Sequence, residues 1–337
     1  MRFTGLKYLQ LLACLGLFAC GSAERYDVVI VDNLSNSDMN AVEGVRRITG
    51  VEVPFEKADC CDRDAFRKVF EKYDFDSVIH FAASKAVGES VGKPLEYYRN
   101  NLVSFMNVID LMREFGRHNI VFSSSCTVYG EPEKQPIEEG DRTEPTNPYG
   151  ATKLAIENML KWCDCAYNIR YVALRYFNAC GAHMSGKIGE AHDPETHLIP
   201  IILQVPNGRR DHVSIYGDDY PTRDGTCVRD YIHVTDLASA HILAAEYLMN
   251  GGENNVFNLG NGVGFTVKEV IDTAEKVVGK PIKCEMAPRR AGDPAQLVAS
   301  SEKAKTVLGW KPKYDDIETI IGSAWNWHKE HPHGYDD

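Results

Sequence analysis

Tyr149 and Lys153 stand four positions apart, directly after the dipeptide Asn147-Pro148. Positions i and i+4 of a helix share one face, Pro148 suits the first helical position, and Asn147 suits the cap before it. Because a cation beside a phenol stabilises the phenolate, we expect Lys153 to lower the pKa of Tyr149 from about 10 towards working pH. Such a tyrosine can take a proton from an alcohol. An ordinary surface tyrosine and lysine are the alternative interpretation.

Three serines, Ser123 to Ser125, end a predicted strand upstream of Tyr149. A serine hydroxyl there can hydrogen-bond the oxygen whose proton Tyr149 removes. Serine, tyrosine and lysine together make a proton-transfer site of the kind that lies beside a nicotinamide. A polar strand end is the alternative, and the spacing to Tyr149 and Lys153 favours the catalytic interpretation.

Two aspartates follow predicted strands near the start of the regular pattern. A carboxylate at Asp32 can accept both ribose hydroxyls of an adenosine and would repel a 2′-phosphate, which favours NAD over NADP. Asp59 follows the next strand and is a candidate for contact with adenine. The alternatives are a turn or cap role for Asp32 and, for Asp59, a cap for a helix that begins near Asp62.

Short apolar runs alternate with helical stretches from residue 26 onward. Strands are predicted at 26–31, 77–81, 119–122 and 170–175, and helices include 64–73 and 97–115. Continuous β-branched runs are typical of parallel strands covered on both faces. The alternation predicts an α/β fold with a doubly wound, Rossmann-like parallel sheet. Ligands of such sheets bind at the carboxyl ends of the strands.

The composition changes after residue 177, where Gly, Pro, Asp and His become frequent. We therefore expect a Rossmann-like NAD-binding domain over 1–177 and a second, smaller α/β lobe for the substrate over 178–337. A helix at 230–248 and a strand at 255–259 indicate that residues 233–260 return to the first domain. A further helix is expected around Trp325 and Trp327.

Charge and cysteine usage exclude several functions. The 337-residue chain has 37 Lys and Arg against 48 Asp and Glu, a net charge of −11, which argues against a nucleic-acid partner or an anionic membrane surface. The ten cysteines include no Cys-x-x-Cys pair, so we expect no metal site. In a chain of this length they favour reduced thiols and a cytoplasmic protein.

Residues 1–23 conflict with this pattern. Arg2 and Lys7 precede an apolar run from Tyr8 to Cys20, and small residues follow. The segment resembles a secretory or lipoprotein signal and is too short to span a bilayer comfortably. Three interpretations compete: a signal that exports or lipid-anchors the protein, a divergent first strand and helix, or a segment that replaced the true start. The sequence after residue 26 favours the third.

Specific sequence blocks occur in a fixed order along the chain. They include VVIVDNLSNS (28–37), FSSSCTVYGE (122–131), NPYGATK (147–153), LRYFNACGAH (174–183) and RRAGDPAQLVAS (289–300). In order and spacing they resemble the UDP-glucose 4-epimerases, which are extended short-chain dehydrogenases/reductases. One departure is that the family opens with a strand and Gly-x-x-Gly-x-x-Gly, which grips the NAD pyrophosphate. Only Gly5, Gly16 and Gly21 occur before residue 26, at another spacing.

The resemblance implies a mechanism. Tyr149 takes the proton of the sugar 4-hydroxyl, Lys153 holds the nicotinamide ribose, and Ser125 orients the hydroxyl. The C4 hydride passes to tightly bound NAD and returns to the opposite face of the 4-keto sugar, so that no net oxidation occurs.

The resemblance also implies two sets of binding residues. The cofactor set is Asp32, Asn33, Ser35, Asn36, Asp59, Cys60, Phe81, Ala82, Ala83, Lys85, Asn100, Ser123, Tyr149, Lys153 and Phe177. The substrate set is Ser125, Cys126, Thr127, Tyr149, Asn178, His197, Leu198, Tyr216, Arg229, Arg290 and Asp293. A salt bridge with Asp230 or another acid is the alternative for Arg229, and core packing is the alternative for Phe81 and Phe177.

Other functions stay open. A sugar-nucleotide 4,6-dehydratase would need an acidic pair after the strand-end threonine, which Ser125-Cys126-Thr127 does not supply. An epimerase of another UDP sugar (UDP-GlcNAc, a uronate or a pentose) and an inactive UDP-sugar-binding pseudoenzyme are the alternatives. Leu297 matches a position whose bulk gates N-acetylated sugars, and we expect a preference for UDP-glucose and UDP-galactose. Relatives are usually homodimers, and 97–115 and 149–162 are the candidate interface helices.

Overall fold

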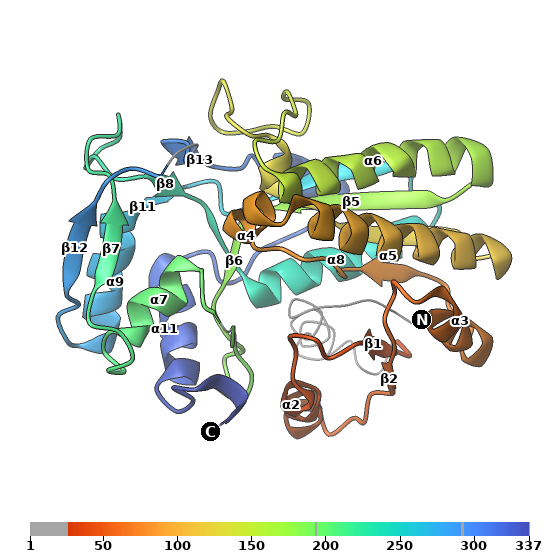
Figure 1. The fold of residues 1–337 in the computed structure, drawn as a ribbon, viewed down its shortest axis with the longest axis horizontal. Helices are drawn as coiled ribbons and strands as arrows, with labels where there is room; N and C mark the ends of the chain where they lie inside the picture. The colour runs from red at the N-terminus through yellow and green to blue at the C-terminus, as the bar shows by residue number, and fades with distance from the viewer. Residues whose placement is uncertain (1–25, 193, 291–292, 337) are drawn as a thin grey trace.

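The structure, a computed structural model, describes residues 26–192, 194–290 and 293–336. The interpretations of residues 1–23 therefore concern a segment outside the described residues. Figure 1 shows two parts, a strand-and-helix layer with α5 and α6 side by side and a smaller lobe that carries β7, β12, α9 and α11.

The main sheet contains four parallel strands in the order β10-β5-β4-β3. They are β3 (Val78–His80), β4 (Asn119–Ser123), β5 (Arg170–Tyr176) and β10 (Asn255–Leu259). The prediction of parallel strands at these places is confirmed. The late strand β10 pairs with β5, so the chain returns to the first sheet after the second lobe has begun.

Two further parallel strands precede this sheet in sequence. β1 (Ile30–Asp32) pairs with β2 (Phe55–Lys57), and within the described residues no strand pairing joins them to the main sheet. The strand predicted over 26–31 is thus confirmed only at its end.

Helices cover both faces of the main sheet. On one face α3 (Arg63–Lys72), α5 (Pro94–Glu114) and α6 (Pro148–Tyr167) share a hydrophobic cluster with Val78 and Ile120. On the other face α2 (Met39–Thr49) and α8 (Val234–Met249) share a cluster with the next strand residues, Ile79 and Val121. Successive side chains of a strand point to opposite faces, so these alternating partners confirm the doubly wound arrangement.

The prediction of one helix over 230–248 is wrong at its start. Tyr231–His233 form strand β9, which pairs in parallel with β6 (Asn178–Cys180), and α8 begins only at Val234. All three β9 residues are buried. A buried aromatic and β-branched run of this length fits a strand covered on both faces.

The second lobe is built around its own hydrophobic cluster. That cluster joins α7 (Leu198–Gln204), α9 (Val267–Val278) and α11 (Ile317–His328), and it includes residues of β7 (Val213–Tyr216). β7 pairs in parallel with β12 (Cys284–Ala287). The remaining elements are α4 (Val87–Gly92), η1 (Cys126–Val128), β8 (Val228–Arg229), β11 (Phe265–Thr266), β13 (Gln296–Leu297), α10 (Glu302–Val307) and η2 (Gly334–Asp336).

Among the described residues, no helix has the length and apolar character needed to cross a bilayer. The eight cysteines in this part of the chain form no disulfide.

Candidate active site

The start of α6 has the local structure that its sequence predicts. Pro148 is the first helical residue, and the Asn147 side chain accepts a hydrogen bond of 2.9 Å from the Gly150 amide. Tyr149 therefore lies in the first turn and Lys153 one turn later, and both are buried. The competing interpretation of a surface pair is wrong.

Lys153 connects α6 to the carboxyl end of β4. Its Nζ donates a hydrogen bond of 2.7 Å to the Ser123 carbonyl and lies 5.7 Å from the centroid of the Tyr149 ring. Burial lowers the pKa of Lys153 to about 7, and the Glu157 carboxylate acts in the opposite direction. The ammonium is thus held beside the phenol ring by the end of the strand.

The expected lowering of the Tyr149 pKa by Lys153 is wrong for the protein by itself. Burial raises the pKa of Tyr149 above its usual value, and the nearby Tyr176 acts in the same direction. A hydrogen bond with the Ser125 side chain acts in the opposite direction. Loss of hydration disfavours the phenolate, so burial opposes ionisation of this side chain.

The serine run connects three elements. Ser123 is within 2.9 Å of the Tyr176 hydroxyl at the end of β5, and Ser124 donates a hydrogen bond of 2.5 Å to Glu157 on α6. Ser125 precedes the short helix η1, and its Oγ accepts a hydrogen bond of 3.0 Å from the Thr127 hydroxyl. Cys126 lies between them, and burial raises the pKa of its thiol to about 12.

Six predicted cofactor residues line one pocket of about 270 Å³, part of which is open to solvent. They are Asn33, Asp59, Cys60, Ala82, Ala83 and Asn100, and they are joined by Ala58, Cys61 and Ser104. The pocket lies at the carboxyl ends of β2 and β3, where an α/β sheet binds its ligands.

Asp32 and Asp59 have different local roles. Asp32 is buried at the end of β1, and its Oδ1 accepts hydrogen bonds from the Leu34 amide at 2.6 Å and the Ser37 hydroxyl at 2.7 Å. The turn interpretation of Asp32 is therefore correct for that oxygen. Asp59 accepts from the Asn33 side chain at 2.8 Å, whereas Asp62 caps α3, so the cap interpretation of Asp59 is wrong.

The other predicted cofactor residues are not all gathered in this pocket. Phe81 is buried against His241, with ring centroids 4.5 Å apart, and Phe177 is buried at the end of β5. The Lys85 Nζ lies 2.8 Å from Nε2 of His192. Ser35 and Asn36 lie exposed in the turn after β1.

Arg229 forms an ion pair, as its alternative interpretation proposed, but the partner is Asp293. Asp230 is instead buried and accepts hydrogen bonds from three backbone amides, those of Asn261, Gly262 and Ala299, at 2.7 to 3.0 Å. The side chain of Asn178 donates to the Asp230 carbonyl at 2.8 Å. One predicted substrate residue, Arg229, thus lies on β8, while Asp293 pairs with it and Asn178 bonds to the residue that follows it.

Two further residues of the predicted substrate set, Tyr216 and Arg290, contact each other. The Arg290 guanidinium lies 3.9 Å from the centroid of the Tyr216 ring, and hydrogen bonding with it lowers the pKa of Tyr216. Leu297, on β13, packs against a small cluster that includes Phe177. His197 and Leu198 mark the start of α7.

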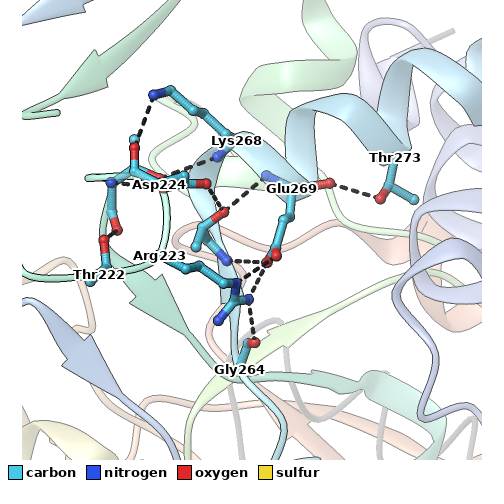
Figure 2. Close-up of polar contacts among 9 residues, drawn as sticks. Thr222, Arg223, Asp224, Gly264, Lys268, Glu269 and Thr273 are labelled. Atoms are coloured by element: carbon cyan, nitrogen blue, oxygen red, sulfur yellow. Dashed lines mark hydrogen bonds and ion pairs between the residues drawn. The ribbon is translucent and has the colours of Figure 1, made fainter.

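A polar clamp holds the loop between Tyr216 and Arg229 (Figure 2). Arg223 pairs with Glu269 in the first turn of α9 and donates to the Gly264 carbonyl at 3.0 Å. Asp224 accepts from the Thr266 hydroxyl at 2.5 Å. These contacts hold the connection between β7 and β8 against α9. Tyr216 is the last residue of β7, and Arg229 lies on β8.

Comparison with known proteins identifies the family. A family model described as GDP-mannose 4,6 dehydratase matches residues 21–322. A UDP-glucose 4-epimerase of Halalkalibacterium halodurans is 54% identical over 308 residues, covering 91% of this chain and 90% of that protein. A crystal structure of a UDP-glucose 4-epimerase matches with a TM-score of 0.93 and 46% identity, covering 100% of both chains. The chain belongs to the UDP-glucose 4-epimerase family.

A second solved structure describes a family member with ligands. The UDP-glucose 4-epimerase of Bifidobacterium longum, in complex with NAD+ and UDP, is 41% identical, with a TM-score of 0.93 over 99% of this chain and 100% of that one. The predicted α/β, Rossmann-like class is confirmed by these epimerase folds.

Sequence reasoning missed a buried polar network behind the epimerase-family Tyr-Lys pair. Arg175 of β5 forms a two-point ion pair with Glu157, at 3.0 and 2.6 Å, and donates to the Tyr129 hydroxyl at 2.9 Å. The Tyr129 hydroxyl donates in turn to Asn258 of β10 at 2.7 Å. One sequence signal was available, because Glu157 follows Lys153 by four residues on the inner face of α6.

Replacing Glu157 by alanine tests this network. Glu157→Ala leaves the buried Arg175 guanidinium without its carboxylate partner, so we expect the free energy of unfolding to fall by about 3–5 kcal/mol in denaturant titrations. The matched control is Glu302→Ala, which breaks an exposed pair with Lys305 and should change that free energy by less than about 1 kcal/mol. Equal effects of the two substitutions would contradict the assignment.

Proposed function

We propose that the protein is a UDP-glucose 4-epimerase that interconverts UDP-galactose and UDP-glucose through transient oxidation at sugar C4 with tightly bound NAD. The observation that carries the proposal is the meeting of Tyr149, Lys153 and Ser125 at the carboxyl end of β4.

The protein's own residues move one proton in each direction. Tyr149 removes the proton of the 4-hydroxyl while Ser125 hydrogen-bonds that oxygen, and Tyr149 returns the proton after the keto sugar has presented its other face. NAD, when bound, supplies the hydride acceptor and a positive ring charge that lowers the raised pKa of Tyr149. Lys153 would hold the ribose of the nicotinamide when NAD is bound.

Six of the fifteen predicted cofactor residues line the pocket that we assign to NAD. Asp32, with its carboxylate buried at the end of β1, is our proposed acceptor for the adenosine ribose hydroxyls, which excludes a 2′-phosphate. The pocket at Asn33, Asp59, Cys60, Ala82, Ala83 and Asn100 receives the adenine side. Ser35, Asn36, Phe81, Lys85, Ser123 and Phe177 complete the proposed cofactor set.

The substrate is held by its UDP part, which leaves the sugar free to turn. Arg229 and Arg290 face the diphosphate, since an arginine fork matches phosphate oxygens. Tyr216 contacts the uridine side. Asn178, His197, Leu198, Asp293, Cys126 and Thr127 complete the proposed substrate set. Leu297 sets the space beside the sugar, and equal rates with UDP-GlcNAc would refute the expected preference for UDP-glucose and UDP-galactose.

We propose the division at residue 177/178 into a cofactor domain and a substrate lobe, with 233–260 belonging to the first. The pairing of β10 with β5 supports this division. Hydrogen-exchange protection measured with and without UDP would test the lobe assignment.

We place the activity in galactose metabolism in the cytoplasm.

Replacing Tyr149 by phenylalanine tests the catalytic assignment. Tyr149→Phe removes the proton acceptor, so we expect kcat for UDP-galactose to fall at least about 100-fold. Tyr167→Phe on the same helix is the control, because its side chain is exposed at the other end of α6, and it should keep full activity. A Tyr149→Phe enzyme with wild-type kcat would overturn the proposed mechanism.

A second candidate is a UDP-sugar-binding protein without a cofactor. It is favoured by one observation, the lack of Gly-x-x-Gly-x-x-Gly before residue 26. Denaturing the purified protein and measuring the released NAD by absorbance separates the two functions. We expect about one NAD per chain, whereas UDP binding without NAD and without turnover would establish the alternative.

We also propose a homodimer formed through α5 and α6, which lie side by side in Figure 1. Large apolar side chains are exposed on α4, α5 and α6, namely Val91, Leu95, Tyr98, Met106 and Trp162. Trp162 is 75% exposed, which is unusual for a side chain of this size.

A charge at Trp162 tests the dimer. Trp162→Glu should shift the protein from dimer to monomer in sedimentation velocity, because a carboxylate would be buried in the interface. Val263→Glu, at an exposed loop position outside these helices, is the control and should remain dimeric. A wild-type protein that sediments as a monomer would contradict the proposal.

A further inference from the structure

Four titratable side chains converge between β6 and α7. Nδ1 of His192 lies 3.1 Å from Glu190 and 3.2 Å from Glu195, and Nδ1 of His197 lies 3.0 Å from each carboxylate. One ligand-type atom from each of the four residues lies within 4.8 Å of the others. Glu195 is almost completely buried, whereas the His197 side chain is 39% exposed.

Two chemistries fit such a cluster, a metal site and a hydrogen-bonded charge cluster. Lys85 decides between them, since its Nζ lies 2.8 Å from Nε2 of His192. An ammonium group only donates hydrogen bonds, so Nε2 accepts and Nδ1 carries the proton. A metal bound to Nδ1 would move the proton to Nε2. The Nε2–H of a metal-bound histidine normally donates to an acceptor, but here it would face the Lys85 ammonium, which is also a donor. The hydrogen-bonded cluster is therefore favoured.

The charges of the cluster balance when His197 is an imidazolium. Lys85 and His197 then neutralise Glu190 and Glu195, and the His192 ring connects Lys85 to the two carboxylates. The carboxylates raise the pKa of His197 to about 9 against the effect of burial, and the histidines lower the pKa of Glu195 to about 2. His328 of α11 interacts electrostatically with Glu190, Glu195 and His192, and burial lowers the pKa of His328.

We propose that this cluster, resting on the proposed epimerase function, couples the cofactor side to the substrate side, with His192 as a positioning residue. Lys85 follows β3 in the proposed cofactor set, and His197 precedes α7 in the proposed substrate set. Contacts along Lys85–His192–Glu190/Glu195–His197 fix the His197 imidazole at the start of α7, and we assign the UDP diphosphate as the anion that it binds. Its ligand is an anionic nucleoside diphosphate, and its disruption weakens binding without removing the proton-transfer residues.

His192→Leu and His192→Gln form a matched pair for the test. Leucine breaks the link, whereas the glutamine amide can accept from Lys85 and donate to a carboxylate. We expect His192→Leu to raise both KM for UDP-galactose and the Kd of UDP about tenfold, the loss of one charge-assisted hydrogen bond, with kcat within about twofold. His192→Gln should restore most of the affinity. Unchanged KM and Kd in His192→Leu would overturn the proposal.

The pH dependence gives a readout that a purely structural role would not move. His197 keeps its charge below pH 9, so the Kd of UDP should rise as the pH increases from 8 to 10. His197→Gln removes this charge, so it should bind UDP more weakly at pH 8 and show a smaller rise in Kd from pH 8 to 10; the lowered pKa of Tyr216 leaves a second titrating group on the substrate side. The same steep profile in His197→Gln would overturn the proposal.

Two outcomes separate this inference from the proposed function and from a metal site. If the wild type binds UDP but does not epimerise UDP-galactose, the proposed function fails. The Kd of UDP for His192→Leu and His192→Gln, measured by calorimetry, still tests the proposed role of the cluster in that case. If the wild type binds one Zn²⁺ per chain, and His192→Leu abolishes this binding, the cluster is a metal site and the inference is wrong.

Discussion

The buried ammonium of Lys153 is the constraint on which the site depends. An isolated ammonium removed from water is unstable, so the protein must surround it with acceptors and negative charge. The Ser123 carbonyl accepts its hydrogen bond, and the Glu157 carboxylate one turn further along α6 favours its charged form. Glu157 is in turn fixed by Arg175 from the neighbouring strand.

This arrangement connects α6 to three strands. Through Ser123 and Ser124 α6 is bound to β4, through Arg175 to β5, and through Tyr129 and Asn258 to β10. Because these contacts are buried, a displacement of α6 would leave several charged or polar groups without partners. The position of Tyr149 is therefore set by the sheet as well as by the helix that carries it. Burial raises the pKa of Tyr149, so a positive charge bound beside the ring would favour the ionised phenol.

Local signals explain what the sequence could predict. The Asn147 cap, Pro148 at the helix start and the β-branched runs of β3, β4 and β5 depend on neighbouring residues, and each lies where the pattern predicts it. Partners that are distant in sequence were not predictable in this way. Arg229 pairs with Asp293 rather than with its neighbour Asp230, and Arg175 meets Glu157 from another element. The pKa of Tyr149 depends on burial, which spacing alone does not give.

The most direct test of the central claim follows the hydrogen at C4 of the sugar. UDP-galactose labelled with deuterium at C4 is incubated with the purified protein, and the product is analysed by NMR and mass spectrometry. If the same hydride is removed and returned within one site, the product is UDP-glucose that keeps its deuterium at C4. The configuration at C4 is inverted. Formation of UDP-glucose that has exchanged its C4 deuterium for hydrogen from solvent would contradict the account.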